Sequence, residues 1–153
     1  MNIFVLDSDP KICASYHCDK HVVKMVLETA QILCSALYIN GATNLPYKPT
    51  HLNHPCVKWA AANNENFAWL LQLGFWLSYE YELRYGKKHK SEAVIIECSK
   101  HFGLIPSGTL NDFCFCVPEK YITMNAVYSY REYYRAEKLS IAKYKTQTPY
   151  WLN

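Results

Sequence analysis

The most reactive residue types in this chain recur at helical spacing near its start. An α-helix turns about 100° per residue, so residues three, four and seven apart share a face. One arc of this helical wheel collects seven polar side chains: His17, Lys20, His21, Lys24, Glu28, Gln31 and Ser35. Imidazoles, amines and a carboxylate at successive turns can shift one another's pKa and exchange protons. We therefore favour a catalytic or ligand-binding strip over an ordinary solvated face.

A single long helix is expected to carry this polar arc. The sequence predicts a helix from Pro10 to about Tyr38, with Asp9 as the N-cap and Pro10 at the first helical position. Asn40 and Gly41 favour its end. The rest of the wheel is almost wholly apolar, which predicts burial on most sides. The polar arc should then face a ligand or a cleft.

Zinc is an alternative occupant of the same arc. His17 and His21 have the i,i+4 spacing of zinc-binding helices, and four cysteines could complete a ligand set: Cys13, Cys18, Cys114 and Cys116. The chain has no CxxC pair and no HExxH motif, and Lys20 and Lys24 would place cations beside the metal. We therefore expect neither a metal nor another cofactor.

Three further regions offer groups that could contact a phosphate or a base. His51, Asn53 and His54 directly precede a predicted helix N-terminus, where free N–H groups favour anions, although Asn53 or His54 could simply cap that helix. The second long helix and the basic run after it contribute Arg84 and Lys88. The last helix interleaves tyrosines with arginines and could stack bases, through Tyr130 and Tyr134. An i,i+4 ion pair with Glu80 is the favoured explanation of Arg84, unless this face packs across the pocket from the first helix. Core packing explains much of the last helix.

The remaining pattern predicts a mainly α, compact single domain over residues 1–153. Residues 3–6 form a short apolar extended segment, and periodic apolar residues indicate helices over 54–85, 91–102 and 124–144. Asn63 and Asn64 interrupt the first of these periodic regions. The fold should therefore contain three to four helices with a short N-terminal extended segment.

Composition and net charge limit the size of the domain, its cellular compartment and its classes of partner. The 153 residues are half apolar, enough for one ordinary domain with a real core. Seven cysteines, an odd number, and a start without a signal-peptide pattern predict reduced thiols in the cytoplasm, or in the host cytoplasm if the protein is viral. No apolar run approaches a membrane span, so we expect no membrane partner. A net charge of +3 neither requires nor excludes nucleic acid.

The first helix resembles that of a known family. Asp19-Lys20-His21 followed by Glu28 is similar to the signature of the phage-type pyrimidine-dimer DNA glycosylases, the endonuclease V family, whose catalytic glutamate lies nine positions after the aspartate. Residues 50–55 resemble the loop that opens the family's second helix, and residues 149–151 resemble its C-terminal segment. The start is also similar to that of small phage proteins with an HCDKHVVKM-type sequence. The resemblance implies an endonuclease V-like helical fold.

The resemblance also implies a mechanism. In the family, the N-terminal amine attacks the sugar C1′ and the glutamate assists, which puts Glu28 in the glutamate's place and His21 in the histidine's. The family exposes its amine by removing Met before a small residue, whereas Asn2 here should largely retain that Met. Lys20 or Lys24 could supply the amine instead. Leu27 and Gln31 replace two arginines that hold DNA phosphates in the family.

These observations predict a DNA N-glycosylase/AP lyase that acts on a damaged or modified base. The first alternative is a non-catalytic phage pocket protein for immune evasion, a homodimer that sequesters a free cyclic or ADP-ribose-type nucleotide signal. The second is a nucleotide phosphodiesterase that uses His17 or His21 as acid and base. A purely structural role is the remaining alternative.

Overall fold

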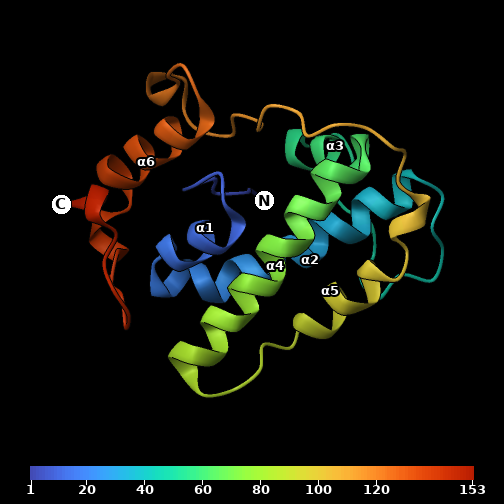
Figure 1. Cartoon of the computed structure of the whole chain (residues 1–153), viewed down its shortest axis with the longest axis horizontal. Coiled ribbons are helices and arrows are strands. Elements are labelled where there is room, and N and C mark those ends of the chain that lie inside the picture. Colours follow the sequence, from blue (N-terminus) through green and yellow to red (C-terminus); the bar gives the residue numbers. More distant parts are fainter.

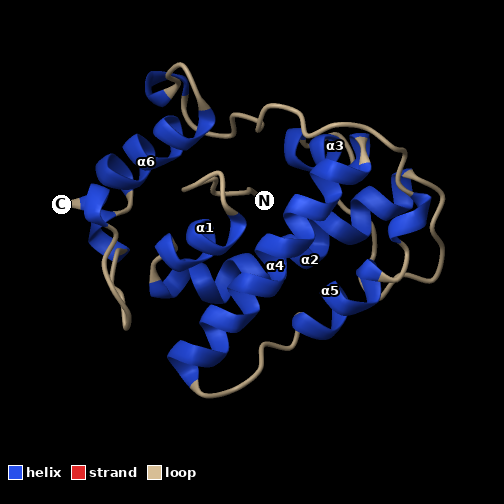
Figure 2. Ribbon diagram, in the orientation of Figure 1, coloured by secondary structure: helices blue, strands red, loops and turns tan.

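The computed structural model describes residues 1–153 and is entirely helical, without a β-strand (Figure 2). Four short 3-10 turns accompany six α-helices, which are α1 (Pro10–Tyr16), α2 (Asp19–Ile39), α3 (Pro55–Ala62), α4 (Asn64–Tyr85), α5 (Glu92–Ser99) and α6 (Ala126–Glu137). The mainly α prediction is confirmed. The expected number of three to four helices is too low, because two of the predicted helical regions are broken in the middle.

The first break separates α1 from α2. His17 and Cys18 adopt extended backbone angles, with ψ of 133° and 161°. The guanidinium of Arg84 binds two backbone carbonyls at this break. Its Nη1 donates to the carbonyl of His17 and its Nη2 to that of Ser15. The hydroxyl of Tyr134 accepts from the N–H of Cys18. Backbone groups that a continuous helix would pair internally are therefore satisfied by side chains from α4 and α6.

The second break, between α3 and α4, lies where the two asparagines predict it. Asn63 is extended, with φ −160° and ψ 165°, and its side-chain oxygen caps α4 by accepting from the N–H of Asn66. Its Nδ2 donates to the carbonyl of Thr109 and to Oδ1 of Asn111. The break therefore also anchors the long connection that follows α5.

Helix α2 is the core of the domain. It packs against α3, α4 and α5, and most of its apolar side chains are buried, although Val23, Leu27 and its last two residues are exposed. At its crossing with α4 there is no room for a side chain at Gly74, because an added Cβ would lie 2.9 Å from Cγ2 of Thr29. By length and composition alone α2 could span a membrane, but 67% of its most apolar stretch is buried inside the fold. Burial of this kind is typical of the central helix of a globular domain.

The last third of the chain wraps around the other helices. After α5, a long connection without regular helices crosses the molecule to α6, which lies on the far side from α5 (Figure 1). Helix α6 ends at Glu137, well before the predicted residue 144, because the following residues turn back and pair with the start of α2. The N–H of Asp19 donates to the carbonyl of Lys143, and Oδ1 of Asp19 accepts from the N–H of Lys145. Helix α5 likewise ends at Ser99, short of the predicted residue 102.

Both chain ends are built into the structure. Residues 3–6 are buried and extended, as predicted, but they have no strand partner. Trp151 and Leu152 are also buried. The N-terminal segment lies between α6 and the bundle of α1 to α4 (Figure 1). The start of the chain is therefore inside the fold and close to α2.

Candidate functional site

The carboxylate of Glu28 faces the first residues of the chain. It is 8% exposed, and its Oε2 accepts from the backbone N–H of Asn2 at 3.0 Å. Its Oε1 lies 3.3 Å from Nζ of Lys24. The Asn2 side chain is held by two further residues, because its Nδ2 donates to the carbonyl of Cys116 and its Oδ1 accepts from the hydroxyl of Tyr130. The start of the chain is thus fixed against the carboxylate.

The polar arc lies across the border between core and surface. His17 caps α1 and is not part of α2, so the arc comprises the six residues that follow it. Lys20 and Lys24 are exposed, Gln31 between them on the wheel is half-buried, and Ser35, Glu28 and His21 on the other edge of the arc are buried. Glu28 therefore lies on the inner side of this border, with Lys24 one turn away on the outer side.

The structure separates His21 from Glu28. The two residues are seven apart, so their Cα atoms lie about 10 Å apart along the helix. His21 packs on Phe4, with ring centroids 4.6 Å apart, and its Nδ1 lies 2.7 Å from the hydroxyl of Tyr134. Because that hydroxyl already accepts from the N–H of Cys18, its own proton can be donated to Nδ1, which places the imidazole proton on Nε2. Burial, with help from Lys138 and Lys24, lowers the pKa of His21 to about 4.

His17 and Arg84 lie in the core beneath this site. The Nδ1–H of His17 donates to the carbonyl of Cys13, and its Nε2 is buried without a partner. Burial lowers the pKa of His17 to about 3. All three guanidinium nitrogens of Arg84 are engaged, with Glu80 and Asp19 as its carboxylate partners. Neither side chain presents a free polar group to the surface.

Burial of two neutral histidines predicts a stability that falls in mild acid. The unfolded chain takes up protons on these imidazoles near pH 6.5, whereas His17 and His21 in the folded protein do so only near about 3 and about 4. Their contribution to the free energy of unfolding is therefore fully present above pH 6.5. It is lost progressively as the pH falls below that value, at up to about 1.4 kcal/mol per pH unit for each histidine. Urea unfolding of the wild type and of His17→Gln, at several pH values, measures this. We expect His17→Gln to reduce the slope of the unfolding free energy against pH by the equivalent of about one proton. An unchanged slope would contradict the burial of His17 as a neutral imidazole.

The loop before α3 is tied to the same region by His54. Its Nδ1 accepts from the N–H of Cys56, which caps α3, and Sγ of Cys56 lies 3.9 Å from Oδ1 of Asn2. His51 and Asn53 are exposed, and Nδ1 of His51 lies 2.7 Å from Oγ1 of Thr50. The structure therefore brings His54, but not His51, into contact with residues that surround Asn2.

A basic surface borders the exposed side of the arc. The Nε2–H of His89 donates to the carbonyl of Val23 at 3.0 Å, which holds residues 87–90 beside α2 between Lys20 and Lys24. These two lysines are exposed, as is Lys88. We call this surface the basic edge, formed by Lys20, Lys24, Lys87, Lys88 and Lys90. Five lysines on one edge can contact phosphates of a nucleic-acid backbone.

The two predicted tyrosines of α6 are buried completely. The hydroxyl of Tyr130 contacts Asn2 and the N–H of Cys116, and the hydroxyl of Tyr134 contacts His21. Both rings therefore position residues of the site from behind and leave no face for a base. The largest cavity, about 570 Å³, lies elsewhere, between residues 7–8, the 110–115 segment and the start of α6, and does not include Glu28.

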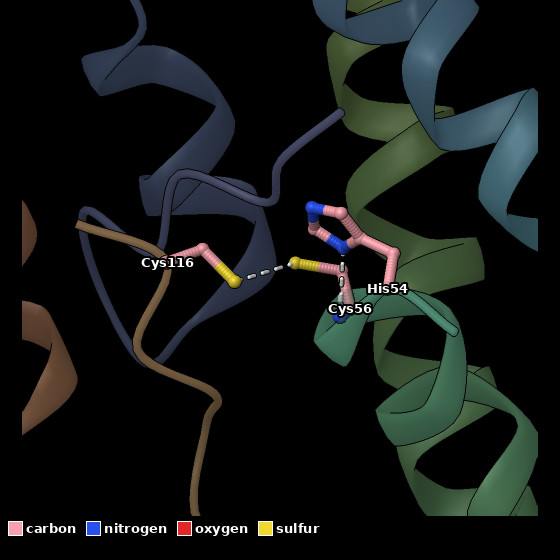
Figure 3. Close-up of side chains that lie close together, drawn as sticks. All are labelled: His54, Cys56 and Cys116. Atoms are coloured by element: carbon pink, nitrogen blue, oxygen red, sulfur yellow. Dashed lines mark hydrogen bonds between the residues drawn. The ribbon is translucent and has the colours of Figure 1, made fainter. Parts of the chain in front are cut away.

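Sequence reasoning named Tyr130 and Cys116 for other roles and did not predict that they hold the start of the chain. Asn2, Cys116 and Tyr130 form one hydrogen-bonded set although they are far apart in sequence. One signal was present, because His54 and Cys56 are two apart and so are Cys114 and Cys116, which is a ligand spacing other than CxxC. Ligand atoms of His54, Cys56 and Cys116 lie within 4.8 Å of one another (Figure 3). The pKa of Cys116 is lowered because the Cys114 and Cys56 thiols donate to it.

The fold and the site together define a class: an all-helical domain in which a carboxylate of the first long helix faces the chain's own N-terminal segment. A family model described as pyrimidine dimer DNA glycosylase matches residues 1–93 of the 153, a stretch that holds Asn2, Glu28 and helices α1 to α4. The chain belongs to the pyrimidine dimer DNA glycosylase family, as the resemblance of its first helix indicated. This family points to DNA as the substrate and to DNA repair. No curated protein and no solved structure matches the chain significantly.

Proposed function

We propose that the protein is a DNA N-glycosylase/AP lyase whose reacting pair is Glu28 and the nitrogen of residue 2. The observation that carries this proposal is the 3.0 Å distance from that nitrogen to Oε2 of Glu28. Asn2 favours retention of Met1, so this nitrogen is the α-amine, rather than an amide, only in the fraction of chains that lose Met1. A general base must lie within about 2.6–3.2 Å of the atom whose proton it takes, and this distance falls in that range.

The proposed chemistry needs only these two groups and the substrate. The amine attacks C1′ of the damaged nucleotide, the bond from C1′ to the base breaks, and the base leaves with the bonding electrons and is protonated. Glu28 takes the proton that the amine loses, which leaves the nitrogen bonded to C1′ of the closed sugar. The C1′–O4′ bond then breaks and O4′ takes up a proton, so that a protonated imine links the chain to the opened sugar. The same carboxylate is placed to assist removal of the C2′ proton in the lyase step.

Lys24 is the alternative amine. Its Nζ is 3.3 Å from Oε1 of Glu28, but its side chain is 64% exposed, so burial does not remove its water. An α-amine begins from a pKa about 2–3 units below that of a lysine side chain and is therefore the better nucleophile near neutral pH. Lys20, also exposed, has no contact with Glu28 and suits a phosphate contact on the basic edge.

The damaged base must leave the DNA stack to bring C1′ to this pair. Base extrusion is the general solution for enzymes that act on a base within duplex DNA. The basic edge lies next to Glu28 on the outer side of α2 and suits the phosphates that flank the extruded nucleotide. The opposing alternatives have less support, since Arg84, Tyr130 and Tyr134, which were expected to grip a nucleotide, already have partners inside the fold. A cytoplasmic location, a homodimer and a phage immune-evasion role stay predictions from sequence.

Borohydride trapping on duplex DNA with one abasic site tests the proposal. We expect a covalent adduct, and peptide mapping should place it on the α-amine of residue 2 in chains that have lost Met1. Intact-mass measurement before the reaction gives the fraction of chains with and without Met1. An adduct on Lys24 would overturn the assignment of the amine, and the absence of any adduct from chains without Met1 would overturn the lyase function.

A further inference from the structure

Three thiols converge where α3 begins. Sγ of Cys56 lies 3.4 Å from Sγ of Cys114 and 3.5 Å from Sγ of Cys116. The ligand atoms of His54, Cys56 and Cys116 lie within 4.8 Å of one another, and we call these three residues together with Cys114 the thiol cluster. Figure 3 shows that the side chains of Cys56 and Cys116 point toward one another, from α3 and from the connection after α5, with the His54 ring beside them. Three good metal ligands from two distant segments therefore meet at one point, and a fourth, Cys114, contacts them through Cys56.

The backbone arranges these ligands in two pairs. Cys114 and Cys116 lie in an extended stretch, where residues two apart face the same side, and that side is toward Cys56. His54 and Cys56 flank Pro55 at the N-terminus of α3, where free N–H groups and the helix dipole favour a thiolate. Each pair is thus fixed by local structure before any ligand binds.

The distances suit a tetrahedral metal better than a disulfide. A disulfide needs sulfurs about 2.05 Å apart, and only two of the three thiols could form one. Zinc–sulfur bonds of about 2.3 Å in a tetrahedral site place the sulfurs about 3.8 Å apart. The observed separations from Cys56, 3.4 and 3.5 Å, require only a small outward adjustment to reach this value, whereas Cys114 must also move closer to the rest of the group. Three sulfurs and an imidazole are also a known ligand combination for structural zinc.

We propose that the thiol cluster binds one Zn²⁺ ion as a closed structural site, with Cys56, Cys114, Cys116 and His54 as its ligands. Binding releases the three thiol protons to solvent and leaves three thiolates and a neutral imidazole around the ion. His54 exchanges its hydrogen bond from the N–H of Cys56 for the metal. His17 and His21, which the sequence analysis considered as zinc ligands before it favoured no metal, are not part of this site.

The ion would fasten the start of the chain. The carbonyl of Cys116 accepts from the side chain of Asn2, and the N–H of Cys116 donates to the hydroxyl of Tyr130, which in turn donates to Asn2. A metal that fixes Cys116 to α3 therefore also fixes residue 2 next to Glu28. Its role is to position residues, and it lies outside the reacting pair.

Metal content and a cobalt spectrum test this proposal without reference to activity. Protein expressed with added zinc and purified without chelators should retain about one Zn²⁺ per chain after gel filtration. Reconstitution with Co²⁺ alone should give a thiolate-to-cobalt charge-transfer band and the visible bands of tetrahedral cobalt. Cys56→Ser should lose at least about nine-tenths of the bound zinc, because this sulfur contacts both of the others.

The control uses the second close pair of thiols in the protein. Sγ of Cys34 lies 3.5 Å from Sγ of Cys98, and Cys98→Ser should leave the zinc content unchanged. If Cys56→Ser fails to fold, Cys114→Ser provides the same measurement from the connection after α5. Wild-type protein that binds no zinc and gives no cobalt–thiolate band would overturn the proposal, as would a Cys56→Ser variant with full zinc content or a native disulfide at Cys56.

Discussion

Glu28→Gln should slow cleavage of abasic-site DNA by about 10²–10⁴-fold, the usual contribution of a general base. The amide keeps the size of the side chain, and its oxygen can still accept from the nitrogen of residue 2. It cannot take the proton that the amine loses on attacking C1′. The loss should therefore fall on the chemical step, with DNA binding nearly unchanged.

Single-turnover cleavage, together with DNA binding by fluorescence anisotropy, separates these two effects. Gln31→Ala is the matched control, because Gln31 lies on the same arc, is half-buried, and forms no side-chain hydrogen bond with Glu28. We expect this variant to retain wild-type cleavage within a small factor. A Glu28→Gln variant with wild-type rate would exclude the carboxylate as the base.

An alanine inserted between Met1 and Asn2 should reduce imine formation by about 10²-fold or more, because a displacement of about 1 Å in a reacting group can have that effect. The small second residue would allow Met1 to be removed, so the chain would still begin with a free amine. That amine would belong to the inserted alanine, one residue before Asn2, and would be displaced from Glu28. The Asn2 side chain would keep its contacts with Cys116 and Tyr130.

The rate of borohydride trapping measures this effect, and intact mass verifies the N-terminus of each sample. An alanine added after Asn153 is the control, since it lengthens the chain at the opposite end and should leave trapping unchanged. Equal trapping by the inserted and wild-type proteins would mean that the amine does not come from the start of the chain. That result would favour Lys24 as the source of the amine.

Local patterns in the sequence were enough to predict the mainly α class of fold. The wheel from Asp19 to Ile39, the paired asparagines at 63 and 64, and the apolar run at residues 3–6 each depend on neighbours in the chain. The break at His17 and Cys18 was not predictable in this way, because Arg84 and Tyr134 satisfy the freed backbone groups from α4 and α6. A helix whose end is determined by distant side chains gives no local signal.

The candidate site was also predictable only where it depends on local sequence pattern. Glu28 was identified from its place on the helix and from the family resemblance, which also implied an N-terminal amine as its partner. The contact between Glu28 and the nitrogen of residue 2 was not predictable from the sequence pattern, because an extended segment of a few residues has no informative period. The wheel also gave the polar arc without showing which edge faces outward. The structure shows that Lys24 is exposed and His21 is buried, and the difference comes from Phe4 and Tyr134, which cover only one edge.

The anchoring of Asn2 by Tyr130 has a consequence for synthesis of the protein. The two residues are separated by 128 positions, so the first part of the chain to be made reaches its final place only after nearly all the rest exists. Contacts of such long range close late and slow the folding of a domain. A nascent or truncated chain that ends before α6 would contain every residue of the family match and still lack an ordered reacting pair. Competence to cut DNA should therefore arise only after translation is essentially finished.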